Sequence, residues 1–187
     1  MLALVTGASS GIGRDMAREL SRRGYDLIIT ARRRDRLEEL AEKLPTRVRV
    51  IEMDLSRADN CRRLHELTAE EPVDVLINNA GFGVFGAFEE SDLERELEML
   101  DINIRATHML TKLYLRDFLR RGEGMILNVS SSAAFLPGPL LSSYYASKAY
   151  VLRLTEAIHE ELRRKGSAVY IGALCPGPVK TEFDRVA

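Results

Sequence analysis

Short runs of apolar residues alternate with longer amphipathic segments along the whole chain. Several of the short runs are apolar at nearly every position, which is typical of strands that are covered on both faces in a parallel sheet. The runs that we interpret as strands are Leu2–Val5, Leu27–Thr30, Val48–Met53, Val73–Ile77, Met125–Val129 and Val169–Leu174.

The segments between these runs carry apolar residues at helical spacing, and the last of them shows one apolar stripe opposite a charged side. The predicted helices are Ile12–Arg23, Asp35–Leu44, Arg57–Ala69, Ser91–Arg121 and Ser142–Lys165. Because strand and helix alternate, we expect βαβ units with right-handed crossovers. The pattern therefore predicts a doubly wound α/β fold of three layers, with a parallel sheet of about six strands.

Polar residues interrupt the apolar pattern of the long segment 91–121. Asp101 and Asn103 stand there among leucines and isoleucines, and buried polar groups need partners. We expect this helix to begin after the turn Glu89–Asp92, and the polar pair either to bend it or to mark a functional site. No linker or repeat divides the 187 residues, which predicts a single domain spanning residues 1–187.

Composition excludes several classes of function. The 27 Lys and Arg residues nearly balance 28 Asp and Glu, giving a net charge of −1, so the charge predicts neither nucleic acid nor an anionic membrane as a partner. We expect no signal peptide, because a strand-like run and a glycine turn follow Met1 almost at once, and no membrane span, because no apolar stretch approaches about 18 residues. Cys61 and Cys175 are distant, and the three histidines join no cluster, so we expect inert thiols, no metal and a cytoplasmic location.

Three glycines, Gly7, Gly11 and Gly13, follow the first predicted strand directly. Glycine allows a tight turn and a close approach of backbone to ligand, and the following helix start offers N–H groups to phosphate. A turn of this kind between strand and helix predicts a site for the pyrophosphate of a dinucleotide. The residues expected to hold it are Gly7, Ser9, Ser10, Gly11, Ile12 and Gly13.

The end of the second strand indicates which dinucleotide is preferred. NAD sites place an Asp or Glu there to accept from ribose hydroxyls, whereas this chain has the run Thr30–Arg34 with no acid. Arg32 can bind a 2′-phosphate through two hydrogen bonds, so we favour NADP(H) over NAD(H). We assign Arg33, Arg34 and Arg36 to the solvated face of the next helix.

Two more strand ends should face the same ligand, since the carboxyl ends of parallel strands share one edge of the sheet. Asp54 and Leu55 follow the third strand and could border the adenine. The run Asn78–Gly81 follows the fourth strand, and Asn79, Ala80 and Gly81 are expected to contact the cofactor.

Tyr144 and Lys148 are four residues apart in a predicted helix, and Ser131 stands thirteen residues before the tyrosine. The spacing places phenol and ammonium on one helix face. A nearby cation lowers a tyrosine pKa from its usual value of about 10. Such a tyrosine can exchange a proton with a substrate oxygen, and a serine hydroxyl can hold the same oxygen.

Taken together, these residues make the chain resemble the short-chain dehydrogenase/reductase family of Rossmann-fold oxidoreductases. The matching motifs, in the family's order, are Thr6-Gly7-x-x-x-Gly11-Ile12-Gly13, Asn78-Asn79-Ala80-Gly81, Asn103, Ser131, Tyr144-x-x-x-Lys148 and Pro176-Gly177-x-Val179-x-Thr181. The resemblance implies a nicotinamide cofactor and reversible conversion between a carbonyl compound and an alcohol.

By the same resemblance, Tyr144 would give its proton to the carbonyl oxygen and Ser131 would stabilise the developing alkoxide. Lys148 would lower the tyrosine pKa and hold the nicotinamide ribose, in contact with the cofactor as Tyr144 would be. Asn103 would anchor a water that relays protons to Lys148.

The resemblance also assigns the nicotinamide half of the cofactor. Asn79 and the loop residues Pro176, Gly177 and Val179 would hold it, and Thr181 would contact its amide or the phosphates.

Neighbouring residues leave some alternatives open. Tyr145 adjoins Tyr144 but has no lysine four residues on, and Ser130 and Ser132 flank Ser131 and should point the other way on an extended strand end. A group of phenylalanines could either line a substrate entrance or pack in the core: Phe82, Phe85, Phe88 and Phe135.

Members of the family normally continue beyond the point that corresponds to Ala187. We therefore expect this chain to lack much of the substrate wall and the final strand, which would leave the strand 169–174 at an uncovered edge. We also expect a homo-oligomer, a dimer through the helices 93–121 and 142–165 and a tetramer if a C-terminal region exists.

Three functions remain open at this point. The leading hypothesis is an NADP(H)-dependent carbonyl reductase or alcohol dehydrogenase acting on a ketone or secondary alcohol, a small molecule. The alternative is a catalytically impaired NADP-binding regulatory or scaffold protein of the same fold. A third is an epimerase or dehydratase of a nucleotide sugar, against which the glycine spacing argues.

Overall fold

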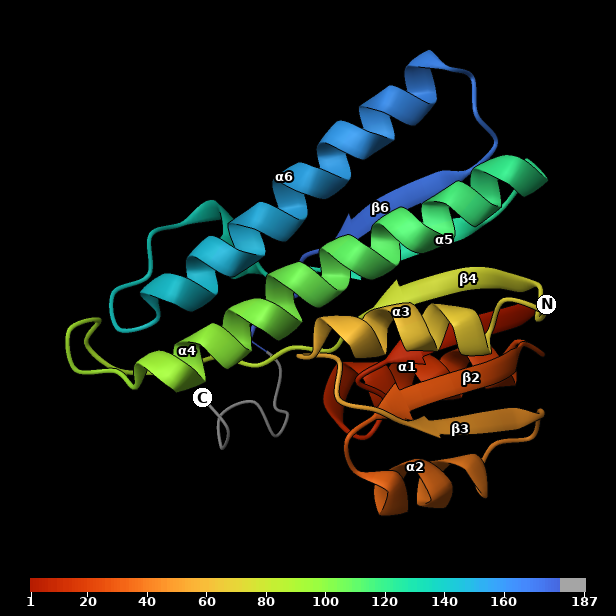
Figure 1. Cartoon of the computed structure of the whole chain (residues 1–187), viewed down its shortest axis with the longest axis horizontal. Helices are drawn as coiled ribbons and strands as arrows, with labels where there is room; N and C mark the ends of the chain where they lie inside the picture. The colour runs from red at the N-terminus through yellow and green to blue at the C-terminus, as the bar shows by residue number, and fades with distance from the viewer. Residues whose placement is uncertain (179–187) are drawn as a thin grey trace.

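A computed structural model gives the arrangement of residues 1–178 (Figure 1). The strands are β1 (Leu2–Thr6), β2 (Asp26–Ala31), β3 (Val48–Glu52), β4 (Val73–Asn78), β5 (Met125–Val129) and β6 (Tyr170–Leu174). The helices are α1 (Gly11–Arg22), α2 (Arg34–Ala41), α3 (Ala58–Leu67), α4 (Leu93–Leu100), α5 (Thr107–Arg121) and α6 (Ser142–Arg164), with the π-helix η1 (Asp101–Ala106) and the 3-10 helix η2 (Ser132–Phe135). Every strand and helix predicted from the sequence is present within three residues of the expected ends.

One parallel sheet joins the six strands in the order β3-β2-β1-β4-β5-β6. The chain first builds outward from β1 through β2 to β3, then returns to the other side of β1 with β4 and builds outward again. The direction in which successive strands are added to the sheet therefore reverses between β1 and β4. In open parallel sheets a ligand binds in the crevice at the carboxyl ends of the strands on either side of such a reversal. The predicted doubly wound α/β fold is confirmed.

Alternate residues of the central strands feed two separate cores. Leu4 and Leu76 point to the face covered by α3, α5 and α6, where they are fully buried. Val5 and Ile77, their neighbours in sequence, point to the face covered by α1 and α2. This two-residue period inside runs that are apolar throughout is the reason the strands show no polar alternation.

The long segment predicted as one helix is continuous but changes its winding in the middle. The side chain of Asp92 caps its start by accepting from the Arg95 N–H at 2.7 Å, and Gly122 ends it with a left-handed φ of 82°. Between α4 and α5 the residues Asp101–Ala106 form a π-helix, a feature that often marks a functional site. Within residues 1–178, no helix has both the length and the apolar character needed to cross a membrane.

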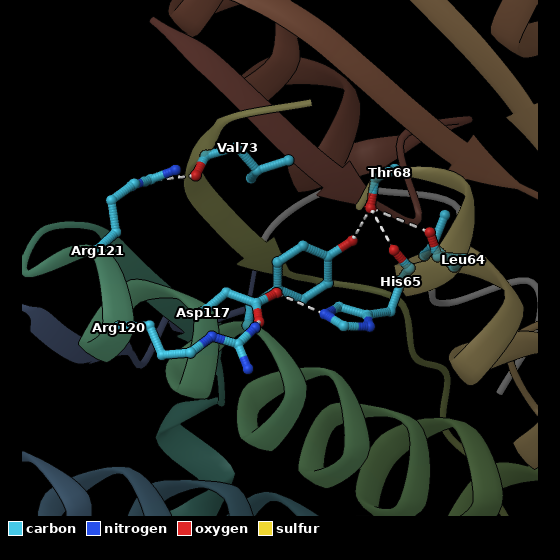
Figure 2. A network of polar contacts seen from close by, with 8 residues as sticks. Leu64, His65, Thr68, Val73, Asp117, Arg120 and Arg121 are labelled. Carbon is cyan, nitrogen blue, oxygen red and sulfur yellow. Dashed lines mark hydrogen bonds and ion pairs between the residues drawn. The ribbon is translucent and has the colours of Figure 1, made fainter. Parts of the chain in front are cut away.

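A polar network holds α3 against α5 at the amino end of the sheet, away from the edge where ligand is expected (Figure 2). His65 Nε2 lies 2.5 Å from Asp117 Oδ2, and Arg120 also binds Asp117. The buried hydroxyl of Thr68 lies 2.6 Å from the phenol oxygen of Tyr114. These contacts give His65 a structural role between α3 and α5.

Candidate active site

A cavity of about 520 Å³ opens at the carboxyl ends of the strands, where the order of strand addition reverses between β1 and β4. It brings together residues from most of the segments that the sequence singled out. The expected site residues that line it are Gly7, Ser9, Ser10, Gly11, Ile12, Arg32, Asp54, Leu55, Asn79, Ala80, Gly81, Ser131, Tyr144, Lys148, Pro176 and Gly177. Gly13 and Asn103 lie behind the wall, and Val179 and Thr181 fall outside the described residues.

The glycine turn is pressed against the end of β4. Gly7 has a left-handed φ of 67°, and a Cβ there would lie 2.8 Å from the Cα of Ala80. The side-chain amide of Asn79 donates to the carbonyl oxygens of Thr6 at 3.0 Å and Gly7 at 3.2 Å. A Cβ on Gly13 would collide with the same amide. The left-handed backbone and the close approach to Ala80 therefore require glycine at Gly7, and this turn lies next to the start of α1.

This turn suits a pyrophosphate. α1 begins at Gly11, and its N-cap residue Ser10 makes no side-chain cap hydrogen bond to the helix. The first N–H groups of a helix have no partners within that helix and carry the positive end of its dipole. An anionic group placed at the mouth of the turn would therefore be stabilised.

Two arginines from the end of β2 reach different walls of the cavity. Arg33 Nη2 lies 3.1 Å from Ser10 Oγ and 3.3 Å from Ser9 Oγ, beside the glycine turn. Arg32 Nη1 instead pairs with Glu98 Oε1 of α4 at 2.7 Å. The assignment of Arg33 to a solvated helix face was incomplete, because its guanidinium lines the cavity with the serines. Sequence reasoning missed it because adjacent arginines at a strand end give no signal of which way each turns.

Ser131, Tyr144 and Lys148 converge at the other end of the cavity. Tyr144 and Lys148 lie one turn apart on α6, as their spacing predicts. Lys148 Nζ lies 5.8 Å from the centroid of the Tyr144 ring and donates to the Val129 carbonyl oxygen at 3.0 Å. Ser131 is the N-cap of η2 and shares a side-chain hydrogen bond with Tyr144. The three side chains therefore form one group.

The electrostatics differ from the expectation that Lys148 lowers the tyrosine pKa. Burial raises the pKa of Tyr144, and the hydrogen bond with Ser131 offsets only part of that rise. Burial lowers the pKa of the Lys148 ammonium to about 8. Both groups are withdrawn from water, which disfavours phenolate and ammonium alike, so in this structure burial outweighs the lowering of the Tyr144 pKa expected from Lys148.

Asn103 is a buried residue of the π-helix η1, and its side-chain amide makes three hydrogen bonds. Its Oδ1 accepts from the Phe82 N–H at 3.1 Å, and its Nδ2 donates to the Phe82 carbonyl oxygen and to Ser147 Oγ, both at 3.0 Å. A Cβ on Gly81 would lie 2.6 Å from Asn103 Oδ1 and 3.6 Å from Lys148 Nζ. Asn103 thus fixes the strand-end loop directly behind the lysine.

Contacts distinguish some of the neighbouring residues, although Ser130, Ser132 and Tyr145 line the cavity as well. Ser130 is buried and donates to the backbone carbonyl of Lys148 at 2.8 Å, so Ser131 is the serine beside the phenol. The ring of Tyr145 packs against Gly138, where a Cβ would collide with it. Phe82 is buried at the cavity wall. The remaining three phenylalanines are exposed and do not pack in the core: Phe85, Phe88 and Phe135.

Comparison with known proteins agrees with this geometry. The model of the short chain dehydrogenase family matches residues 1–187. An 11-beta-hydroxysteroid dehydrogenase 1A of Arabidopsis thaliana is 39% identical over 191 residues, which cover 98% of this chain and 54% of that protein. This chain thus spans little more than half the length of that relative.

Two solved structures share the fold over almost the whole chain. A short-chain dehydrogenase from Sphingobium yanoikuyae in complex with NADPH superposes with a TM-score of 0.91 at 32% identity, covering 99% of this chain and 74% of that one. A short-chain dehydrogenase/reductase from Burkholderia phymatum in complex with NAD has a TM-score of 0.93 at 29% identity, covering 99% and 68%. This chain belongs to the short-chain dehydrogenase family.

Proposed function

We propose that this chain is an oxidoreductase that interconverts a ketone and a secondary alcohol with NADP(H) as the hydride carrier. The observation that carries the proposal is the convergence of Ser131, Tyr144 and Lys148 in the cavity that also contains the glycine turn. A protein that only bound a nucleotide would have no need of a phenol and a serine hydroxyl hydrogen-bonded to each other there.

The residues divide the chemistry between them. A bound nicotinamide cofactor would supply the hydride. Tyr144 acts as general acid and gives its phenol proton to the carbonyl oxygen, while Ser131 donates a hydrogen bond that stabilises the developing alkoxide. Since burial raises its pKa, Tyr144 keeps this proton throughout the neutral range. Lys148 binds the ribose hydroxyls and, with a pKa of about 8, can return a proton to the phenolate.

The choice of NADP(H) rests on the two arginines at the end of β2. Arg32 and Arg33 line the cavity, and no Asp or Glu stands at this strand end to accept from a ribose hydroxyl. Arg33 with the Ser9 and Ser10 hydroxyls forms a set of donors suited to a phosphate. Related structures in complex with NADPH and with NAD support a nicotinamide cofactor without deciding between the two.

Exposed apolar side chains in the loops after β4 and before α6 favour an apolar carbonyl compound. Phe85, Phe88 and Phe135 expose their rings, and Leu136 and Leu140 in the loop before α6 are exposed as well. The Gly86 N–H donates to the Leu140 carbonyl oxygen at 2.8 Å, which brings the two loops together, and exposed apolar side chains on one surface indicate a place for an apolar partner or ligand.

The proposal is tested by titrating the purified chain with NADPH and with NADH, then adding a panel of apolar and polar ketones. We expect tighter binding of NADPH and oxidation of NADPH by at least one apolar ketone. Binding without turnover of any ketone would favour the regulatory or scaffold alternative. Absence of binding to both cofactors would refute the proposal.

A further inference from the structure

Glu98 brings a carboxylate to the end of β2 from a different part of the chain. Its Oε1 accepts from Arg32 Nη1 at 2.7 Å, although the two residues are 66 positions apart. Both side chains line the cavity, and Glu98 is only 30% exposed. The acidic group that the strand end itself lacks is therefore present in space.

Glu98 is held in this position by contacts that do not involve Arg32. Its second oxygen, Oε2, accepts from Arg95 Nη1 at 2.7 Å. The Arg95 guanidinium stacks on the Phe82 ring, with 4.1 Å between its central carbon and the ring centroid. Phe82 is buried, and Asn103 binds both its N–H and its carbonyl oxygen. These contacts would hold the carboxylate at the cavity if Arg32 turned away from it.

We propose that Glu98 sets the balance between NADP(H) and NAD(H) by competing with the 2′-phosphate for Arg32, an inference that rests on the cofactor function proposed above. A 2′-phosphate has to draw Arg32 from Glu98, and it brings negative charge close to a carboxylate that Arg95 keeps in place. A 2′-hydroxyl has neither cost, because it carries no charge and does not have to draw Arg32 from Glu98. Glu98 thus weakens NADP(H) binding and leaves NAD(H) binding unaffected.

The ion pair withholds Arg32 from a 2′-phosphate more than it orders the Arg32 side chain for binding one. Arg32 is 52% exposed, and exposed ion pairs add little to the ordering of a side chain. Arg33, which binds Ser9 and Ser10, supplies a second cation beside the glycine turn. Removing the Glu98 charge therefore frees Arg32 to bind a phosphate.

The test is calorimetric titration of NADP⁺ and NAD⁺ into the wild-type chain and Glu98→Gln, which needs no substrate. We expect Glu98→Gln to tighten NADP⁺ binding about fivefold and to change NAD⁺ binding by less than about twofold. Glu94→Gln is the matched control, since Glu94 is an exposed acid one turn away on α4 and does not line the cavity. The control should bind both cofactors as the wild type does.

Unchanged or weaker NADP⁺ binding by Glu98→Gln, with a wild type that binds cofactor, would overturn this inference and leave the proposed function standing. Failure of the wild type to bind either cofactor would overturn both. In an Arg32→Gln background the effect of Glu98→Gln should fall below about twofold, because the competition acts through Arg32. An effect of the same size in that background would contradict the role given to Arg32.

Discussion

Ser130 and Lys148 are joined by a buried hydrogen bond in which Ser130 Oγ donates to the Lys148 carbonyl oxygen at 2.8 Å. Lys148 Nζ donates in the opposite direction, to the carbonyl oxygen of Val129 at 3.0 Å. These bonds fasten α6 to the end of β5 at the level of the reacting groups. The position of Tyr144 relative to Ser131 therefore depends on Ser130, to which the proposed reaction assigns no step.

The adjacent serines should separate catalysis from stability. Ser131→Ala is expected to lower turnover about 100-fold, because the developing alkoxide loses a donor, with little change in the free energy of unfolding. Ser130→Ala is expected to lower the free energy of unfolding by about 1–2 kcal/mol, because the Lys148 carbonyl loses a buried partner. Ketone reduction and urea denaturation of both variants measure the two effects, and the reverse result would contradict the assignment.

The depressed pKa of Lys148 predicts a dependence of stability on pH. The folded-state pKa is about 8, below the usual value of about 10.4, so between these values the unfolded chain binds more protons than the folded one. The burial penalty is complete below pH 8 and is relieved as the pH rises, so stability should increase over this window. Urea denaturation of wild type and Lys148→Met, which cannot titrate, should show the wild type gaining stability relative to the variant. A difference that is constant from pH 7.5 to about pH 10 would show that Lys148 does not titrate in this window.

Arg33 should contribute to binding of the 2′-phosphate, although the sequence predicts this role for Arg32. Arg33→Gln is expected to weaken NADPH binding about tenfold and to leave NADH binding within about twofold, as a charge-assisted hydrogen bond is lost. Arg34→Gln is the control, because Arg34 pairs with Glu38 on α2 at 2.7 Å and does not line the cavity. Equal losses for both cofactors would mean that Arg33 does not contact the 2′-phosphate.

Asn103 should contribute to the stability of the fold through its side-chain hydrogen bonds. Asn103→Ala leaves the N–H and the carbonyl oxygen of buried Phe82 without their side-chain partners, so we expect a loss of about 2–3 kcal/mol in the free energy of unfolding. Ser147→Ala removes one of the three bonds and should cost about 1 kcal/mol. Denaturant titration of both variants measures the two losses. Equal losses in the free energy of unfolding would contradict the larger contribution assigned to the bonds between Asn103 and Phe82.

The fold and most of the site could be predicted because they depend on local patterns. The all-apolar strands, the glycine turn at Gly7 and the helical spacing of Tyr144 and Lys148 each fix a position relative to the nearest element. The direction in which Arg33 turns could not be predicted, nor could the Arg32–Glu98 pair, because it joins elements 66 residues apart. The pKa of Tyr144 depends on burial by the whole fold, which spacing does not reveal.

The central claim is that Tyr144 transfers the proton in a cofactor-dependent reduction. The most direct measurement compares Tyr144→Phe with Tyr145→Phe, an adjacent loss of a phenol hydroxyl, for NADPH affinity and ketone reduction. Tyr144→Phe should lose turnover by about 100-fold or more while retaining NADPH binding, and Tyr145→Phe should keep both. Turnover by Tyr144→Phe at the level of Tyr145→Phe would contradict the account.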